Sequence, residues 1–149
     1  MLADTSRGSG FDPERAAMMA ERAAQYAADP VGFVRDRTPL LVADTTPASV
    51  VADIASIMDR ACRMPGYGYA AASLGETDHT PDLGRIHVPT LVVVGEHDRV
   101  CPPADSRLLA NGIPGALYVE VPDSGHLPNQ ECPEVFNRTV GDWLEGLPG

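Results

Sequence analysis

Two residues of this sequence have the types and the spacing that acid–base chemistry requires. Asp98 lies just past the apolar run Leu91–Val94, and His126 lies just past a second apolar run, Val119–Val121. A carboxylate that accepts a hydrogen bond from an imidazole fixes the imidazole tautomer and stabilises the imidazolium. The other imidazole nitrogen is then prepared to act as a general base on a hydroxyl, a thiol or a water molecule.

The elements around Asp98 and His126 predict that the two side chains lie together. Four consecutive aliphatic residues, Leu91–Val94, are typical of a strand that is buried on both faces of a parallel sheet. A helical pattern over residues 104–111 separates the two apolar runs, so strand, helix and strand predict a right-handed parallel crossover. The carboxyl ends of the two strands then meet at the edge where open α/β sheets bind ligands. Neighbouring strands lie roughly 5 Å apart, so a hydrogen bond between Asp98 and His126 is geometrically reasonable if these strands are neighbours.

The sequence offers this pair no evident nucleophile. The G-x-S-x-G elbow that α/β folds use for a catalytic serine has no match, and Gly8-Ser9-Gly10 lacks both the flanking strand and the spacing. Ser124 is too near His126 in sequence to form an elbow. Cys101 is a conceivable nucleophile, but a small buried hydrophobic residue is the more conservative interpretation. The chain therefore holds two parts of a catalytic triad and lacks the third.

Composition excludes several classes of function. The chain has 149 residues, enough for one domain and one core, and a formal net charge of −10. Such an acidic protein without a basic stripe is a poor candidate for binding nucleic acid or an anionic membrane. No apolar run approaches the roughly 20 residues that cross a bilayer. Three widely separated cysteines favour reduced thiols and a cytoplasmic setting, and the dispersed histidines predict no metal site.

The first half of the chain has a helical pattern. Asp12-Pro13-Glu14 is typical of a helix start, and an Ala- and Met-rich helix is predicted over residues 13–28. Further helices are predicted at residues 30–34, 47–58 and 69–74, and a closing helix at 133–144. Leu2–Thr5 has the character of a strand end that runs into a flexible loop. Composition alone favours a disordered N-terminus for this segment.

Residues 86–144 resemble the C-terminal portion of the α/β-hydrolase superfamily. The matching stretches are V-P-T-L-V-V-V-G-E-H-D at 88–98, Pro-Pro at 102–103, I-P-G-A at 113–116, D-S-G-H-L-P at 123–128 and E-x-P-E-x-F at 131–136. Residues 2–5, 63–72 and 77–78 are similar to segments around the family's helical cap. Within the superfamily, the combination is most similar to the 3-oxoadipate enol-lactonase branch.

This resemblance implies a fold class and a role for each member of the pair. The expected class is α/β, a partial α/β-hydrolase fold in which a helical cap precedes the last parallel strands and helices of the sheet. The implied divisions are a core-strand end and loop (1–10), a cap or lid (11–82) and a C-terminal core portion (83–149). Asp98 matches the position of the triad acid and His126 that of the base. A triad hydrolase uses only side chains and water, so no cofactor is expected.

The departure from the family pattern leaves several expectations open. Val100 and Leu127, beside the triad residues, are candidate substrate-binding residues, with ordinary core packing as the favoured alternative. The first strands, the oxyanion loop and the nucleophile elbow are not found, so we expect part of a longer hydrolase of a small-molecule ester or lactone. Such a part is expected to be inactive alone and prone to self-association through exposed edges. The alternatives are a non-catalytic binding or interaction module, and one half of a split hydrolase.

Overall fold

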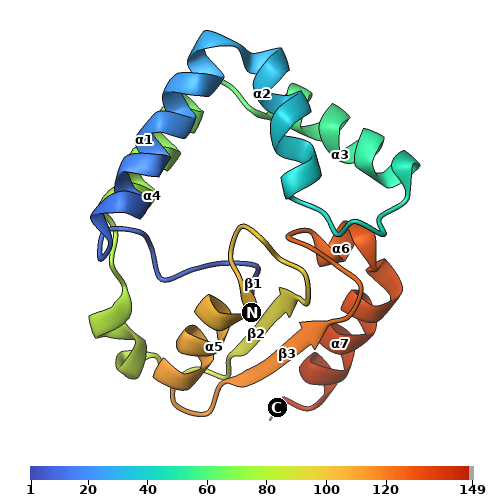
Figure 1. The fold of residues 1–149 in the computed structure, drawn as a ribbon. Helices are drawn as coiled ribbons and strands as arrows, with labels where there is room; N and C mark the ends of the chain where they lie inside the picture. The colour runs from blue at the N-terminus through green and yellow to red at the C-terminus, as the bar shows by residue number, and fades with distance from the viewer. Residues whose placement is uncertain (148–149) are drawn as a thin grey trace.

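A three-stranded parallel sheet forms the centre of the chain. The computed structural model describes residues 1–147, and its strands lie in the order β1-β2-β3 (Figure 1). The strands are β1 (Leu2–Ala3), β2 (Leu91–Gly95) and β3 (Leu117–Val121). The crossover between β2 and β3 contains the helix α5 (Pro103–Gly112). The predicted strand–helix–strand unit is therefore confirmed, with both strands parallel and adjacent.

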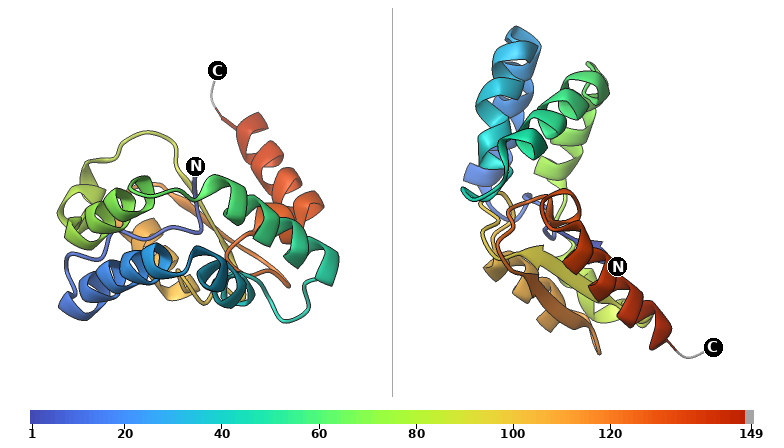
Figure 2. Two further views of the ribbon diagram at one scale, coloured as in Figure 1. Left: turned by 90° about the horizontal axis from the view of Figure 1, so that it is seen from above. Right: turned by 90° about the vertical axis from the view of Figure 1, so that its right-hand side faces the viewer.

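Strand β2 is buried along its whole length because helices cover both faces of the sheet. Val92 packs with Leu109 and Ile113 of α5 on one face. Leu91 and Val93 point the other way, towards α7 (Pro133–Glu145), whose apolar stripe packs on that face. Figure 2 shows α5 and α7 on opposite sides of the sheet. An unbroken apolar run fits this position, since successive side chains of a strand alternate between two buried faces.

The N-terminal segment is ordered rather than flexible. Leu2 and Ala3 pair in parallel with Val92 and Val93 of β2, so the disordered N-terminus favoured by composition was wrong. Two residues carry too little pattern to predict a strand, and the pairing partner lies far along the chain. Asp4 continues the contact, because its backbone N–H donates to the carbonyl oxygen of Val93 at 2.9 Å.

Four helices form a layer beside the sheet. The helical layer comprises α1 (Pro13–Ala28), α2 (Pro30–Arg37), α3 (Ala48–Ala61) and α4 (Gly66–Glu76). Asp12 caps α1 by accepting from the backbone N–H groups of Glu14 and Arg15, and Asp29 caps α2 by accepting from that of Gly32. The predicted bounds of α1 agree with those observed. The other predicted helices are present with ends shifted by a few residues.

The helical layer stands over the carboxyl ends of the strands (Figures 1 and 2). The short 3₁₀ segment Thr38–Leu40 lies between α2 and α3, and a second 3₁₀ segment, Thr80–Arg85, lies between α4 and β2. A short helix, α6 (Pro128–Glu131), precedes α7. Leu83 is buried within the second 3₁₀ segment. Among residues 1–147, every helix is too short or too polar to cross a membrane.

Candidate active site

The carboxyl ends of β2 and β3 bring Asp98 and His126 into contact. His126 Nδ1 lies 2.9 Å from Asp98 Oδ2, as the predicted neighbouring strands require. The Asp98 side chain is 0% exposed, whereas the His126 side chain is 21% exposed. An ionised carboxylate can only accept, so this hydrogen bond places the imidazole hydrogen on Nδ1. In the described chain His126 Nε2 makes no hydrogen bond, so its lone pair is open to a reactant.

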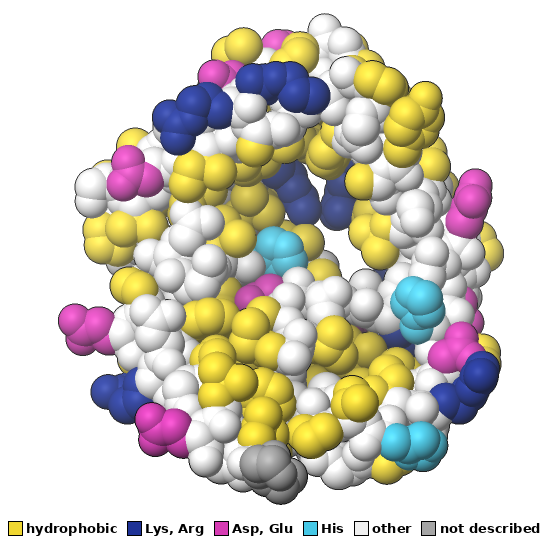
Figure 3. Space-filling model, turned by 180° about the vertical axis from the view of Figure 1, so that it is seen from behind, with side chains coloured by type: hydrophobic (Ala, Val, Ile, Leu, Met, Phe, Trp, Pro, Cys, Tyr) yellow, Lys and Arg dark blue, Asp and Glu magenta, His cyan; other side chains and the backbone are white. Residues whose placement is uncertain are grey.

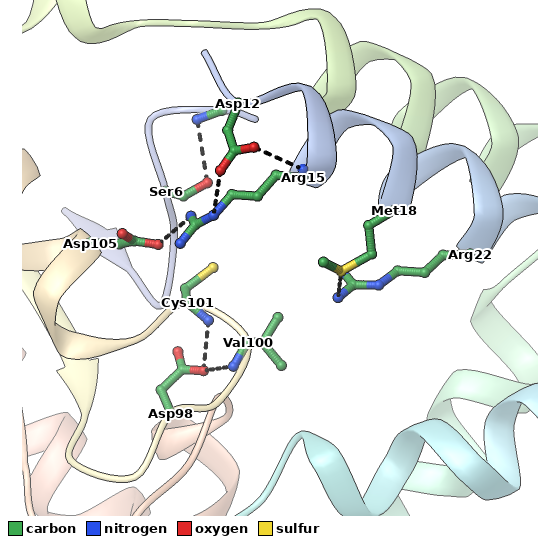
Figure 4. A network of polar contacts seen from close by, with 10 residues as sticks. Ser6, Asp12, Arg15, Met18, Arg22, Asp98, Val100, Cys101 and Asp105 are labelled. Atoms are coloured by element: carbon green, nitrogen blue, oxygen red, sulfur yellow. Dashed lines mark hydrogen bonds and ion pairs between the residues drawn. The ribbon is translucent and has the colours of Figure 1, made fainter. Parts of the chain in front are cut away.

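The turn after β2 fixes the other oxygen of Asp98. Asp98 Oδ1 accepts from the backbone N–H groups of Val100, at 2.7 Å, and Cys101, at 2.9 Å (Figure 4). Because both carboxylate oxygens have donors, the buried charge is compensated and its orientation is set. Asp98 therefore presents one fixed oxygen to the imidazole.

The loop that carries His126 is held against the helical layer. The backbone N–H of His126 donates to the carbonyl oxygen of Leu41 at 2.7 Å. Gly125 allows this approach, because a Cβ there would lie 2.6 Å from the carbonyl carbon of Val42 and 2.8 Å from the nitrogen of Ala43. The imidazole is thus positioned by backbone contacts as well as by Asp98.

Glu131 links the His126 loop to residues 41–46, which connect α2 to α3. Its Oε1 accepts from the backbone N–H groups of Gly125, at 2.9 Å, and Leu127, at 3.1 Å. Its Oε2 accepts from the backbone N–H of Ala43, at 2.8 Å, and from Thr46 Oγ1, at 2.6 Å. One carboxylate therefore connects the segments on both sides of the site.

A second carboxylate, that of the half-buried Asp4, lies at the end of β1. Its Oδ1 accepts from the backbone N–H of Gly95 at 2.9 Å. Burial raises the pKa of Asp4 from its ordinary value to about 7, and the negative charge of Asp98 acts in the same direction. Asp4 has a φ of 47°, in the left-handed region that Asp and Asn tolerate better than most residues. The sheet edge thus holds one carboxyl group that titrates near neutrality.

Neither nucleophile considered from the sequence is well placed. Ser124 is fully buried and its hydroxyl donates to the carbonyl oxygen of Val121 at 2.9 Å, so a substrate cannot reach it. Burial raises the pKa of the Cys101 thiol to about 12, with a further contribution from Asp98. A thiol is a poor nucleophile without its thiolate. Within residues 1–147 no hydroxyl or thiol donates to His126.

Val100 and Leu127 flank the pair but face an apolar cluster. Both are partly buried and pack against the buried residues Leu41, Val42 and Ile54. This packing accounts for their apolar character without a ligand. Their role in substrate binding stays a prediction.

Two other features lie away from the pair. A cavity of about 660 Å³ lies between the segment after β1, α4 and the second 3₁₀ segment, and Leu2, Arg7, Leu74 and His79 are among its lining residues. At the surface, ligand atoms of Glu96, His97 and Asp123 lie within 4.8 Å of one another, and all three side chains are exposed. Neither feature includes Asp98 or His126.

Sequence reasoning gave Asp4 and Glu131 no role. Asp4 stood in a segment expected to be disordered, and only its pairing with β2 places it at the site. Glu131 begins the E-x-P-E-x-F stretch at 131–136, and its position five residues after His126 is the available signal. A short helix, α6, turns this carboxylate back to the loop, and sequence periodicity does not predict such a turn.

The fold and the pair together define a class of protein. A parallel α/β sheet, with an acid and a histidine after adjacent strands and helices over the strand ends, is the arrangement of a hydrolase-type α/β fold. The model of the α/β hydrolase family matches residues 1–139. The chain belongs to the α/β hydrolase family.

Characterised relatives include esterases and lactonases. Over 75 residues, 50% of this chain and 28% of the relative, it is 37% identical to 3-oxoadipate enol-lactonase 2 of Acinetobacter baylyi. A thermophilic esterase from Thermogutta terrifontis, solved with malate bound, superposes with a TM-score of 0.81 and 31% identity over 97% of this chain and 54% of that one. For the enol-lactonase from Burkholderia xenovorans the TM-score is 0.78, with 27% identity over 96% and 54%. The chain thus spans about half the length of these solved relatives.

Proposed function

We propose that this chain supplies the acid and the base of a site that hydrolyses a carboxylic ester or lactone. Asp98 is the acid, His126 is the base, and the serine that completes the triad comes from outside these 149 residues. The observation that carries the proposal is the 2.9 Å contact between a fully buried carboxylate and an imidazole whose Nε2 has no partner in the described chain. The esterase and lactonase relatives support the substrate class.

In this mechanism His126 Nε2 accepts the proton of the serine hydroxyl as its oxygen attacks the ester carbonyl carbon. Asp98 stabilises the imidazolium that forms. The tetrahedral intermediate collapses, the carbon–oxygen bond of the ester breaks, and Nε2 returns the proton to the leaving alkoxide. Water then attacks the acyl-enzyme by the same exchange of protons and releases the acid.

The source of the serine divides the proposal into two cases. It belongs either to a segment of the same polypeptide or to a separate chain, as in a split hydrolase. We retain residues 1–10, 11–82 and 83–149 as the divisions of the chain, with the helical layer as the cap. The chain alone is then inactive in ester hydrolysis, and it self-associates where the missing half would pack.

The decisive experiment compares p-nitrophenyl acetate hydrolysis by the chain alone and by the polypeptide extended upstream in its reading frame. We expect the chain alone to match its His126→Ala variant. We expect the extended polypeptide to turn over, and to lose about a thousandfold or more of its rate in His126→Ala. His87→Ala, which alters an exposed histidine, should leave the rate unchanged.

Each assumption has an outcome that contradicts it. Turnover by the chain alone, lost in His126→Ala, would show that a group within these residues replaces the serine. Turnover by the extended polypeptide that survives His126→Ala would reject the assigned base. If the upstream frame encodes no G-x-S-x-G and no separate chain restores turnover, a non-catalytic binding module becomes the better interpretation.

A further inference from the structure

Three side chains with metal-ligating atoms come together on the two turns that carry Asp98 and His126. Glu96 and His97 lie in the turn after β2, and Asp123 lies in the turn after β3. One ligand atom from each side chain, a carboxylate oxygen or an imidazole nitrogen, lies within 4.8 Å of the other two. An ion bound by all three side chains would therefore join the two turns.

Backbone hydrogen bonds fix the two turns relative to each other. The backbone N–H of Glu96 donates to the carbonyl oxygen of Val121 at 2.9 Å, and that of His97 donates to the carbonyl oxygen of Ser124 at 2.8 Å. The backbone N–H of Asp123 donates to Glu96 Oε2 at 3.2 Å, which holds this carboxylate between the turns. The backbone is thus already in place, and only exposed side chains have to adjust when an ion binds.

The acidity of the chain does not by itself account for this cluster. The formal net charge is −10, but most Asp and Glu side chains on the face shown in Figure 3 stand apart from one another. In the cluster, two carboxylates that are 27 positions apart in the sequence converge on one imidazole. Within residues 1–147 neither Glu96 nor Asp123 pairs with an arginine. A divalent cation would offset both carboxylate charges.

A polar hollow of about 500 Å³ opens beside the cluster. Its lining residues all carry a polar or charged side chain, and they are Asp44, Thr45, Glu96, His97, Asp98 and Arg99. The guanidinium of Arg99 is directed away to Asp44, at 2.9 Å, and to the carbonyl oxygen of Val42, at 2.7 Å. The hollow therefore leaves room for the water molecules that complete the coordination of a bound ion.

The donor set favours a transition-metal ion over calcium or magnesium. Calcium and magnesium prefer about six or more oxygen ligands, whereas this cluster offers an imidazole nitrogen. Zn²⁺ accepts imidazole nitrogen and carboxylate oxygen at about 2.0–2.2 Å, in a tetrahedron whose fourth position water can hold. The dispersed histidines predicted no metal site, because the spacing of histidines does not reveal a ligand that a second turn supplies.

We propose that Glu96, His97 and Asp123 bind a divalent transition-metal ion, with Zn²⁺ as the best match, and that this ion holds together the turns that carry the pair. Asp98 directly follows His97, and His126 lies three positions after Asp123. The bound ion restricts separation of the two turns and takes no part in proton transfer. This inference does not require the proposed function, because binding involves neither the Nε2 atom of His126 nor the missing serine.

The test measures metal binding by the purified chain and, in parallel, by the polypeptide extended upstream. Calorimetric titration with ZnCl₂ should give one ion per chain, with binding at least about tenfold weaker in His97→Ala and in Asp123→Asn. Asn is chosen because position 123 has a φ of 55°, which Asn tolerates. His87→Ala alters an exposed histidine outside the cluster and should bind like the parent chain.

Binding through a cysteine is a separate possibility that the same titration resolves. Cys132 lies near the cluster, since its Sγ is 3.8 Å from the carbonyl oxygen of Asp123. Cys132→Ser should bind Zn²⁺ like the parent chain, and bound Co²⁺ should show the visible absorption of a site without thiolate ligands.

Hydrogen exchange tests whether the ion joins the turns. Zn²⁺ should slow exchange of the backbone N–H groups of Glu96 and His97, which donate across the two turns, and of Asp123. The same addition should leave exchange unchanged in His97→Ala.

The proposal is overturned by any of three results. These are undiminished Zn²⁺ binding to His97→Ala, loss of binding in Cys132→Ser, and the absence of binding at millimolar Zn²⁺. Ca²⁺ that binds as tightly as Zn²⁺ would reject the assignment to a transition metal, and unchanged exchange in both turns would reject the joining role. If Zn²⁺ binds as expected but turnover of the extended polypeptide does not depend on His126, only the proposed function is rejected.

Discussion

At the scale of single residues, the environment of Asp98 determines what the pair can do. Its carboxylate has no exposed side-chain surface and three donors, two from the backbone and one from the imidazole. A carboxylate oxygen that accepts from the imidazole holds the imidazole hydrogen on Nδ1. Changes at Asp98 are therefore expected to alter the tautomer of His126 more than its position.

Replacement of Asp98 by Asn tests this role. The amide can donate to Nδ1 and would then place the imidazole hydrogen on Nε2, which removes the base. We expect Asp98→Asn to lower kcat of the extended polypeptide by about 10³- to 10⁴-fold with little change in KM. The measurement is steady-state hydrolysis of p-nitrophenyl acetate. A loss below tenfold would contradict the assignment of Asp98 as the acid.

Asp4 predicts a pH dependence of stability. Its pKa is about 7 in the folded chain and near 3.8 when unfolded, so the native state holds the proton more tightly. Its contribution to stability is therefore present at low pH and is lost as the pH rises from about 4 to 7. Asp4→Asn keeps an acceptor for Gly95 and removes the buried charge.

We expect Asp4→Asn to match the parent chain below pH 4 and to be more stable by about 1–2 kcal/mol at pH 8, a value reduced for the water that reaches a half-buried group. Urea unfolding at several pH values measures this difference. Asp53→Asn, on the exposed face of α3, is the control. Parallel pH profiles for Asp4→Asn and the parent chain would show that Asp4 does not titrate as described.

At the scale of elements, the strand ends approach one another so closely that two positions admit only glycine. A Cβ on Gly95 would lie 1.9 Å from the carbonyl oxygen of Gly125, and a Cβ on Gly125 would meet the backbone of residues 42 and 43. The end of β2, the His126 loop and the connection between α2 and α3 therefore pack backbone against backbone. The geometry of the pair depends on these contacts.

Gly125→Ala is expected to destabilise the chain by about 1–3 kcal/mol, because neighbouring backbone cannot move without displacing the His126 loop. Chemical denaturation gives the value. Gly141→Ala in α7 is a matched control, since a Cβ there meets nothing within 4 Å. That control should be neutral or stabilising by up to about 1 kcal/mol. Equal stability of the two variants would contradict the close packing.

The elements that the sequence predicted well are those with a strong local pattern. The apolar run Leu91–Val94 and the helical pattern after it predicted two adjacent parallel strands. Those strands in turn predicted the contact between Asp98 and His126. The contributions of Asp4 and Glu131 were not predicted, because each depends on a neighbour far along the chain. Pairing of a two-residue strand and orientation of a long side chain are settled by tertiary packing, which leaves no periodic trace in the sequence.

At the scale of the whole molecule, residues 41–46 join the helical layer to the loops that carry Asp98 and His126. Leu41 accepts from His126, Val42 accepts from Arg99 at 2.7 Å, and Ala43 donates to Glu131 at 2.8 Å. Leu41 and Val42 also belong to an apolar cluster that contains Val100 and Leu127. The helical layer is thus attached to the site by polar and apolar contacts in one short segment.

Glu131→Gln tests this attachment. The amide keeps one acceptor oxygen and replaces the other with a donor, which then faces backbone N–H groups or the Thr46 hydroxyl. We expect a loss of about 1–3 kcal/mol in unfolding free energy and faster hydrogen exchange at residues 41–46 and in the His126 loop together. Glu134→Gln, at an exposed position in α7, is the control. Faster exchange in only one of the two segments would contradict the link.

The contacts of residues 41–46 limit how chimaeras of this chain can be built. A helical layer transplanted from a related hydrolase would have to bring its own version of residues 41–46, together with the residue that meets the carboxylate at position 131. If the exchanged piece left out residues 41–46, the chimaera would have helices of the right shape. Its His126 loop would lack the contacts that these residues supply. Exchange of the helical layer between relatives is therefore constrained by the six-residue segment 41–46 as much as by the helices themselves.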